Sequence, residues 1–123
     1  MAEVVALVDD VFFQAKLLTT AYQCGVKLAT ASATEIFLAE ATRPEAALLI
    51  VDLNARADAI AALEMLRDSG NHRPVIAFFS HVQKDLANRA KSAGCHQVMP
   101  RSKFTQSLAA ILASAKASAG DRS

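Results

Sequence analysis

Five short apolar runs, the last of them weak, are separated along the chain by longer segments of mixed composition. Three of these runs, at residues 4–8, 47–51 and 75–79, are continuous and rich in Val, Ile, Leu and Phe. The run at 26–29 contains a lysine, and the run at 97–99 is short. Continuous apolarity, without alternating polar positions, is typical of a strand that is covered on both faces. We therefore expect five strands, three of them covered on both faces.

Apolar positions at helical spacing fill the segments between and after these runs. The predicted helical stripes cover residues 13–24, 33–41, 59–66, 82–93 and 104–112. Gly25 follows the first stripe as a predicted C-cap. Ser32 and Glu35 form a predicted capping box at the start of the second. The residues from Lys116 onward are small and polar, and we expect them to fray.

Strands that alternate with helices predict a parallel sheet with helices on both faces. A length of 123 residues fits one domain, which we expect at residues 1–118, followed by a frayed C-terminal tail at 119–123. The fold class that we predict is therefore α/β.

Composition and charge narrow the classes of function. Hydrophobic residues make up 53% of the chain and charged residues 20%, which excludes a disordered chain. Thirteen Lys and Arg against twelve Asp and Glu give a net charge of +1. This charge does not favour binding to nucleic acid or to an anionic membrane surface. No apolar run approaches a membrane span, and the two cysteines form no CxxC pair. We expect a cytoplasmic protein with neither nucleic acid nor membrane as partner.

Polar residues stand where the predicted strands end, which is where parallel α/β sheets bind their ligands. They are Asp9 and Asp10 after the first strand, Asp52 after the third, Ser80 and His81 after the fourth, and Arg101 after the fifth. Three carboxylates in one place repel each other and need a cation or protons. Oxygen ligands suit Mg²⁺, and an Asp carboxylate can act as a nucleophile toward a phosphoryl group. The pattern favours a shared acidic pocket, although Asp10 alone is also explained as an N-cap of the first helix.

The residues of these strand ends resemble the receiver domain of two-component response regulators over essentially the whole chain. The resemblance is carried by residues 8–10, 49–54, 74–80, 93–95 and 98–102. It implies a flavodoxin-like (βα)5 fold with a five-stranded parallel sheet of order 2-1-3-4-5. It also implies an atypical, stand-alone receiver.

The resemblance assigns a role to each candidate residue. Asp52 is the phosphoacceptor; Asp9, Asp10, Asp52 and the backbone carbonyl of Asn54 hold Mg²⁺; Ser80 and Arg101 bind the phosphoryl group, with Lys103 as rival to Arg101; Phe79 and His81 control access.

Several positions depart from the family pattern. Arg101 and Ser102 replace the usual Lys-Pro, and Arg is not equivalent to Lys at such a site. Ser80 takes the Thr/Ser position only if the fourth strand carries one extra residue. Val98 occupies the position of the aromatic switch residue, and Tyr22, the only Tyr, lies in the first helix.

The resemblance predicts phosphorelay signalling. Asp52 receives a phosphoryl group from a histidine kinase or phosphotransfer protein, and the output is contact with a downstream protein through the fourth helix, fifth strand and fifth helix. We expect no enzymatic activity beyond self-phosphorylation from a donor and self-dephosphorylation. The departures leave open a phosphorylation-independent pseudo-receiver that acts as an interaction module. A flavin-binding or other small-molecule-binding flavodoxin-like protein is a third alternative, opposed by the absence of a phosphate-binding loop after the first strand.

Overall fold

A computed structural model of the chain describes residues 2–56, 58–80 and 84–121. Five strands and five helices alternate along it. The strands are β1 (Val4–Leu7), β2 (Leu28–Ala31), β3 (Leu48–Asp52), β4 (Val75–Phe79) and β5 (Gln97–Pro100). The helices are α1 (Val11–Cys24), α2 (Thr34–Ala41), α3 (Ala59–Asp68), α4 (Lys84–Ser92) and α5 (Arg101–Asp121). Among the described residues, no helix is long and apolar enough to cross a membrane.

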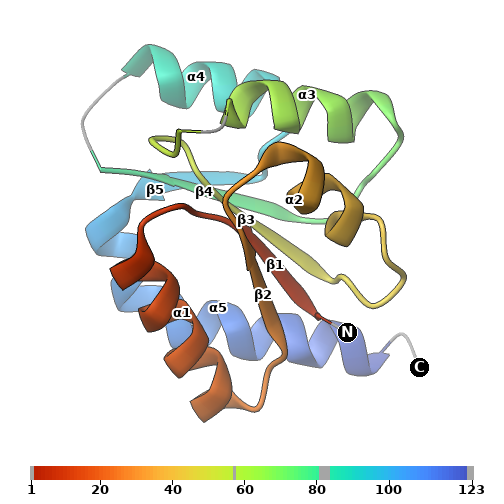
Figure 1. Ribbon diagram of the computed structural model, residues 1–123, viewed down its shortest axis with the longest axis vertical. Helices are drawn as coiled ribbons and strands as arrows, with labels where there is room; N and C mark the ends of the chain where they lie inside the picture. Colours follow the sequence, from red (N-terminus) through yellow and green to blue (C-terminus); the bar gives the residue numbers. More distant parts are fainter. Residues whose placement is uncertain (1, 57, 81–83, 122–123) are drawn as a thin grey trace.

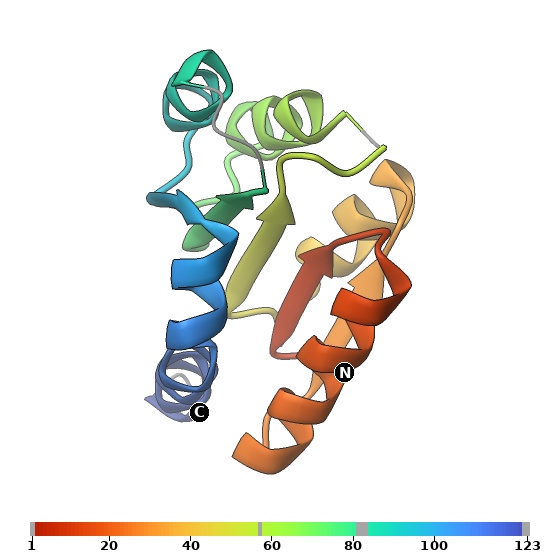
Figure 2. The same ribbon diagram turned by 90° about the vertical axis from the view of Figure 1, so that its left-hand side faces the viewer.

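All strand pairs are parallel, and the sheet order is β2-β1-β3-β4-β5, which confirms the predicted flavodoxin-like topology. The strand arrows in Figure 2 accordingly point the same way. The central strands β1 and β3 are buried along their whole length, whereas the edge strand β5 is partly exposed. This difference explains why the apolar run of β5 is the weakest in the sequence.

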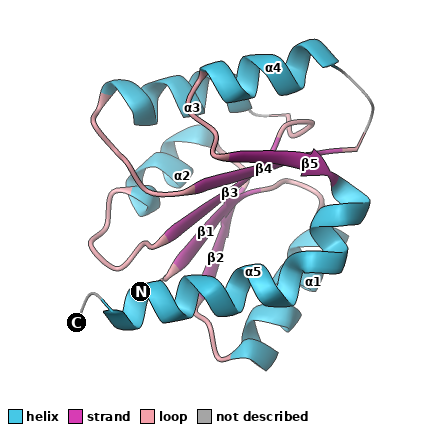
Figure 3. Cartoon of the chain, turned by 180° about the vertical axis from the view of Figure 1, so that it is seen from behind, coloured by secondary structure: helices cyan, strands magenta, loops and turns pink. Residues whose placement is uncertain are grey.

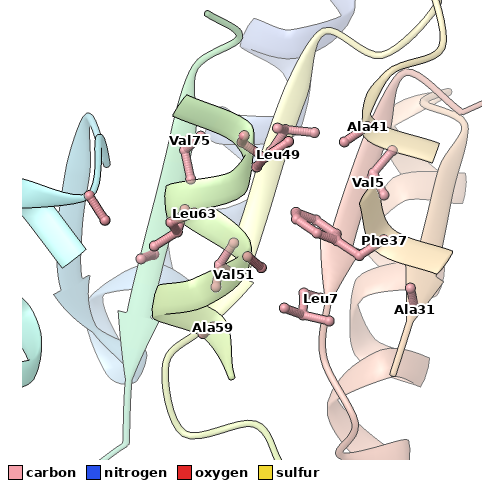
Figure 4. Packing of buried hydrophobic residues seen from close by; sticks show 14 of the residues in the cluster. Val5, Leu7, Ala31, Phe37, Ala41, Leu49, Val51, Ala59, Leu63 and Val75 are labelled. Carbon is pink, nitrogen blue, oxygen red and sulfur yellow. The ribbon is translucent and has the colours of Figure 1, made fainter. Parts of the chain in front are cut away.

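Helices cover both faces of the sheet, with α2, α3 and α4 on one face and α1 and α5 on the other (Figures 1 and 3). Alternate residues of each strand face the two layers. Val5 and Leu7 of β1 pack with Phe37 of α2, as Figure 4 shows, while Val4 and Ala6 belong to the core beneath α1 and α5. Two separate cores therefore hold the sheet between its helices.

An aromatic group fills the second core near the carboxyl ends of the strands. The rings of Phe13 and Phe78 lie 5.0 Å apart, and those of Phe78 and Phe104 are stacked at 4.7 Å. These three side chains join α1, β4 and α5 beneath the strand ends. At the opposite end of α1, the Nζ atom of Lys116 donates a hydrogen bond to the carbonyl oxygen of Gly25 at 3.0 Å.

The helix ends confirm one predicted cap and correct another. Gly25 closes α1 in the left-handed conformation, with φ of 69°, as predicted. The capping box at the start of α2 is wrong, because the N-cap residue is Ala33 and makes no side-chain hydrogen bond. Strand β2 begins at Leu28 rather than at Val26, because the amide of Val26 is bonded to the carbonyl of Ala21 to close α1.

The last helix is longer than its apolar stripe. It begins at Arg101, directly after β5, and continues through Asp121. The predicted tail at 119–123 therefore starts within the helix, and the domain boundary at residue 118 stays a prediction.

Candidate functional site

The carboxyl ends of β1, β3, β4 and β5 bring most of the predicted site residues to one edge of the sheet. Asp9 and Asp10 follow β1, Asp52 ends β3, Asn54 lies in the loop after it, Ser80 follows β4 and Arg101 opens α5. A chain of hydrogen bonds runs across this edge from Asp10 through Arg101, Ser80 and Asn54 to Asp52. His81 lies outside the described residues.

Asp52 is the one buried charged or polar residue among those that the structure describes, with 4% of its surface exposed. Its Oδ1 atom accepts a hydrogen bond from the backbone N–H of Asn54 at 2.9 Å. Burial raises the pKa of the Asp52 carboxyl above its ordinary value, while this hydrogen bond and the charge of Arg101 act in the opposite direction. The cost of burying the Asp52 charge at the end of a central strand is thus partly compensated by this hydrogen bond and by Arg101.

Asp10 has both roles that the sequence allowed. Its Oδ1 atom caps α1 by accepting from the backbone N–H groups of Phe12 and Phe13 at 3.0 and 3.2 Å. Its Oδ2 atom accepts from the guanidinium of Arg101 at 2.9 Å. The hydrogen bond from Arg101, together with the N–H of Phe13, lowers the pKa of the Asp10 carboxyl. Asp10 is therefore both the helix cap and a member of the polar group at the strand ends.

Asp9 faces the loop after β3. Its Oδ2 atom accepts a hydrogen bond from the backbone N–H of Arg56 at 2.7 Å. This bond joins the end of β1 to the loop that follows Asp52.

Arg101 supplies the positive charge at this edge. Its guanidinium carbon lies 4.1 Å from the centre of the Phe13 ring, and its Nη1 atom donates to the Ser80 hydroxyl at 3.4 Å. Lys103, the predicted rival, is exposed and makes no hydrogen bond or ion pair with any described residue. The geometry therefore favours Arg101 over Lys103 as the basic residue of the site.

Asn54 has a contact that sequence reasoning missed. Its side-chain oxygen accepts from the backbone N–H of Ser80 at 2.6 Å, so the loop after β3 is bonded to the loop after β4. The resemblance assigned only the backbone carbonyl of Asn54. An amide side chain two residues after an Asp at a strand end was the available signal.

Phe79 and Ser80 lie on different sides of the sheet edge. Phe78 is the partner of Asp52 in the strand register, and Phe79 packs against the core beneath α2, α3 and α4. Ser80 is exposed and contacts Arg101. Ser80 thus reaches the site, whereas Phe79 is half-buried beside it.

No aromatic side chain stands at the predicted switch position. Val98 is half-buried in β5 and packs against the same core as Phe79. Tyr22 is 87% exposed near the end of α1 and lies far along the helix from the site.

The donor atoms of the site suit Mg²⁺ chemically, because carboxylate oxygens are its preferred ligands. Their arrangement does not fit an ion, because Asp10 already uses both oxygens and Arg101 lies against it. Within the described ranges, no group of three or more Asp, Glu, His or Cys side chains is placed to hold a metal. Mg²⁺ therefore stays a prediction from the resemblance.

Comparisons with known proteins support the fold. No family model matches the chain, and no curated protein matches it in sequence. The chemotaxis response regulator CheY4 of Vibrio cholerae is similar with a TM-score of 0.77 and 18% identity, covering 94% of this chain and 98% of that one. A response regulator receiver domain protein from Clostridium thermocellum gives a TM-score of 0.78 and 18% identity, with 94% of both chains covered.

A longer protein is similar over only part of its length. NtrX from Brucella abortus has a TM-score of 0.76 and 17% identity, and the match covers 94% of this chain but 27% of NtrX. The chain thus spans about a quarter of that protein. Taken together, these similarities confirm the fold of response regulator receiver domains.

Proposed function

We propose that this chain accepts a phosphoryl group on Asp52 and signals by contact with another protein. The observation that carries the proposal is the placement of Asp52. It is a buried carboxylate at the end of a central strand; the N–H of Asn54 donates to it, the charge of Arg101 acts on it, and Ser80 contacts both Arg101 and Asn54. A nucleophile and hydrogen-bond donors for a phosphoryl group are thus within one site.

The chemistry follows from the two oxygens of Asp52. Oδ1 is held by Asn54, and none of the described residues donates a hydrogen bond to Oδ2. In the proposed step, Oδ2 of the ionised carboxylate attacks the phosphorus atom of the donor. The bond from phosphorus to the donor nitrogen or oxygen breaks, and the leaving group keeps its electron pair and takes up a proton from solvent. The product is an acyl phosphate, and we propose that the Ser80 hydroxyl and the Arg101 guanidinium bind its phosphoryl oxygens. We propose no enzymatic activity beyond self-phosphorylation from a donor and self-dephosphorylation.

A histidine kinase or phosphotransfer protein is the proposed donor. Such a protein has to bring its phosphohistidine to the strand ends, beside the start of α1. Val11 and Phe12 are 71% and 89% exposed there, directly after the acidic pair. These two apolar side chains offer a contact for the donor protein next to Asp52. We also propose a cytoplasmic location, with which the two free cysteines agree.

The face formed by α4, β5 and α5 is the proposed output surface. β5 is an edge strand with exposed Gln97 and Pro100, and α5 carries Arg101 from the site at its first residue. A change at the site can therefore reach this face through Arg101. The downstream partner on this face is a protein.

The test is incubation with acetyl phosphate, with and without Mg²⁺, followed by intact mass spectrometry. We expect the wild type to gain one phosphoryl group and Asp52→Asn to gain none. Asp58→Asn is the matched control, because Asp58 is exposed, caps α3 and has no described contact with the site residues. A gain that persists in Asp52→Asn would place the acceptor elsewhere.

The ion pair of Arg101 with Asp10 favours one alternative. A site whose own cation neutralises an acidic residue suits a pseudo-receiver, which binds its partner without phosphorylation. The absence of phosphoryl uptake in both the wild type and Arg101→Gln, with metal present, would support this alternative.

A further inference from the structure

The acidic edge of the sheet contains its own cation. Asp9 and Asp10 follow β1, Asp52 ends the neighbouring strand β3, and the negative charges of Asp9 and Asp10 act on Asp52. Like charges at one edge of a sheet are stabilised by a counter-charge. Arg101 provides it, because its guanidinium lies 2.9 Å from Asp10 and its charge also acts on Asp52.

A divalent ion at this edge would have to break existing contacts. Asp10 accepts two backbone N–H groups on Oδ1 and Arg101 on Oδ2. Asp9 accepts the N–H of Arg56 on Oδ2. An ion that binds Oδ2 of Asp10 therefore has to displace the guanidinium first.

Arg101 is also held by groups that carry no negative charge. Its guanidinium lies over the Phe13 ring at 4.1 Å, and Phe13 is fixed below by Phe78 and Phe104. Its backbone opens α5 directly after β5, and Ser80 accepts a further hydrogen bond. Cation–π contact and helix position keep the guanidinium at the carboxylates even where a metal competes for them.

We propose that Arg101 takes the place of a divalent cation at Asp10, so that the chain binds Mg²⁺ weakly and binds it more tightly when the guanidinium is removed. The inference concerns metal binding alone and does not depend on phosphorylation of Asp52. Its outcome is therefore separate from that of the proposed function.

The test is titration with Mn²⁺, a paramagnetic probe for a Mg²⁺ site, followed by electron paramagnetic resonance of the free ion. We expect Arg101→Gln to bind Mn²⁺ at least about tenfold more tightly than the wild type, which corresponds to about 1.4 kcal/mol. Lys103→Gln removes the same charge two residues away without a described contact, and should bind as the wild type does. Asp10→Asn, added to Arg101→Gln, should abolish the gain.

A second variant makes the test independent of how well Arg101→Gln folds. Arg101→Lys keeps the charge but loses the planar guanidinium, so its affinity for Mn²⁺ should lie between the wild type and Arg101→Gln. Wild-type affinity equal to that of both Arg101 variants would overturn the inference. An equal gain in Lys103→Gln would overturn it as well, since net charge alone would then explain the effect.

Discussion

The buried carboxylate of Asp52 should destabilise the folded chain at neutral pH. Burial raises the pKa of the Asp52 carboxyl. Between the ordinary and the raised pKa, the folded state therefore keeps a proton that the unfolded state releases. Stability from this group is fully present below the ordinary pKa of 3.8 and is lost as the pH rises through the raised value. Asp52→Asn mimics the protonated form, and we expect it to unfold at higher temperature than the wild type at pH 7. Each unit of raised pKa corresponds to about 1.4 kcal/mol.

Thermal unfolding of both proteins over a pH series measures this difference. The difference in unfolding temperature between the wild type and Asp52→Asn should become smaller as the pH falls toward 3.8. Asp58→Asn, which changes an exposed carboxylate and keeps a capping oxygen, should show little gap at any pH. An Asp52→Asn variant less stable than the wild type at pH 7 would contradict the expectation.

Cys95 should be unreactive in the folded chain. Burial raises the pKa of its thiol from 9.0 to about 12, so very little thiolate exists at pH 8. We expect iodoacetamide to modify Cys95 only after unfolding, as read by peptide mass spectrometry. Stability from the neutral thiol should be lost as the pH rises from about 9 toward about 12, and Cys95→Ala should remove that part of the pH dependence. Rapid alkylation of Cys95 in the native protein would rule this out.

At the scale of elements, α1 has two neighbouring phenylalanines with opposite roles. Phe13 is buried against Phe78 and Phe104, whereas Phe12 is 89% exposed. Phe13→Ala should lower the free energy of unfolding by about 3–5 kcal/mol, as loss of a core aromatic does. Phe12→Ala should change it by less than about 0.5 kcal/mol. Urea denaturation of the two variants checks this orientation of α1, and similar losses in both would refute it.

Element type could be predicted from the sequence because each element repeats one simple pattern. The apolar runs of β1, β3 and β4 are buried on both faces, so their composition alone identifies them. The start of β2 could not be predicted, because Val26 is apolar like a strand residue but closes α1 through a backbone bond. The N-cap of α2 could not be predicted either. Ser32 is of a residue type that favours an N-cap, but the backbone of α2 has its N-cap one residue later, at Ala33.

The site was predictable as a set of residues but not as a set of contacts. Strand ends determine which residues meet, and that is a property of sheet order. Which oxygen of Asp10 meets Arg101, and that the Asn54 side chain bonds to Ser80, depends on loop conformation. No periodicity in the sequence encodes these contacts.

At the scale of the whole molecule, we expect a limited response to phosphorylation. Val98 has one side-chain torsion and little volume to move between two positions, so it cannot act as an aromatic switch. Amide chemical shifts of the protein with and without phosphorylation should therefore change mainly in the loops after β3 and β4, with Phe79 and His81 as the expected movers. Large changes across α4, β5 and α5 that survive Phe79→Leu and His81→Ala would show a full switch by another route.

The two ends of α1 are each tied to α5, and the ties have equal spacing. Asp10 and Gly25 are fifteen residues apart, as are their partners Arg101 and Lys116. At about 1.5 Å per residue, both intervals measure roughly 22 Å, so one contact joins α1 and α5 at each end. The two contacts therefore fix the register of α1 and α5 along their length, and Arg101 fixes it at the end that carries the candidate site.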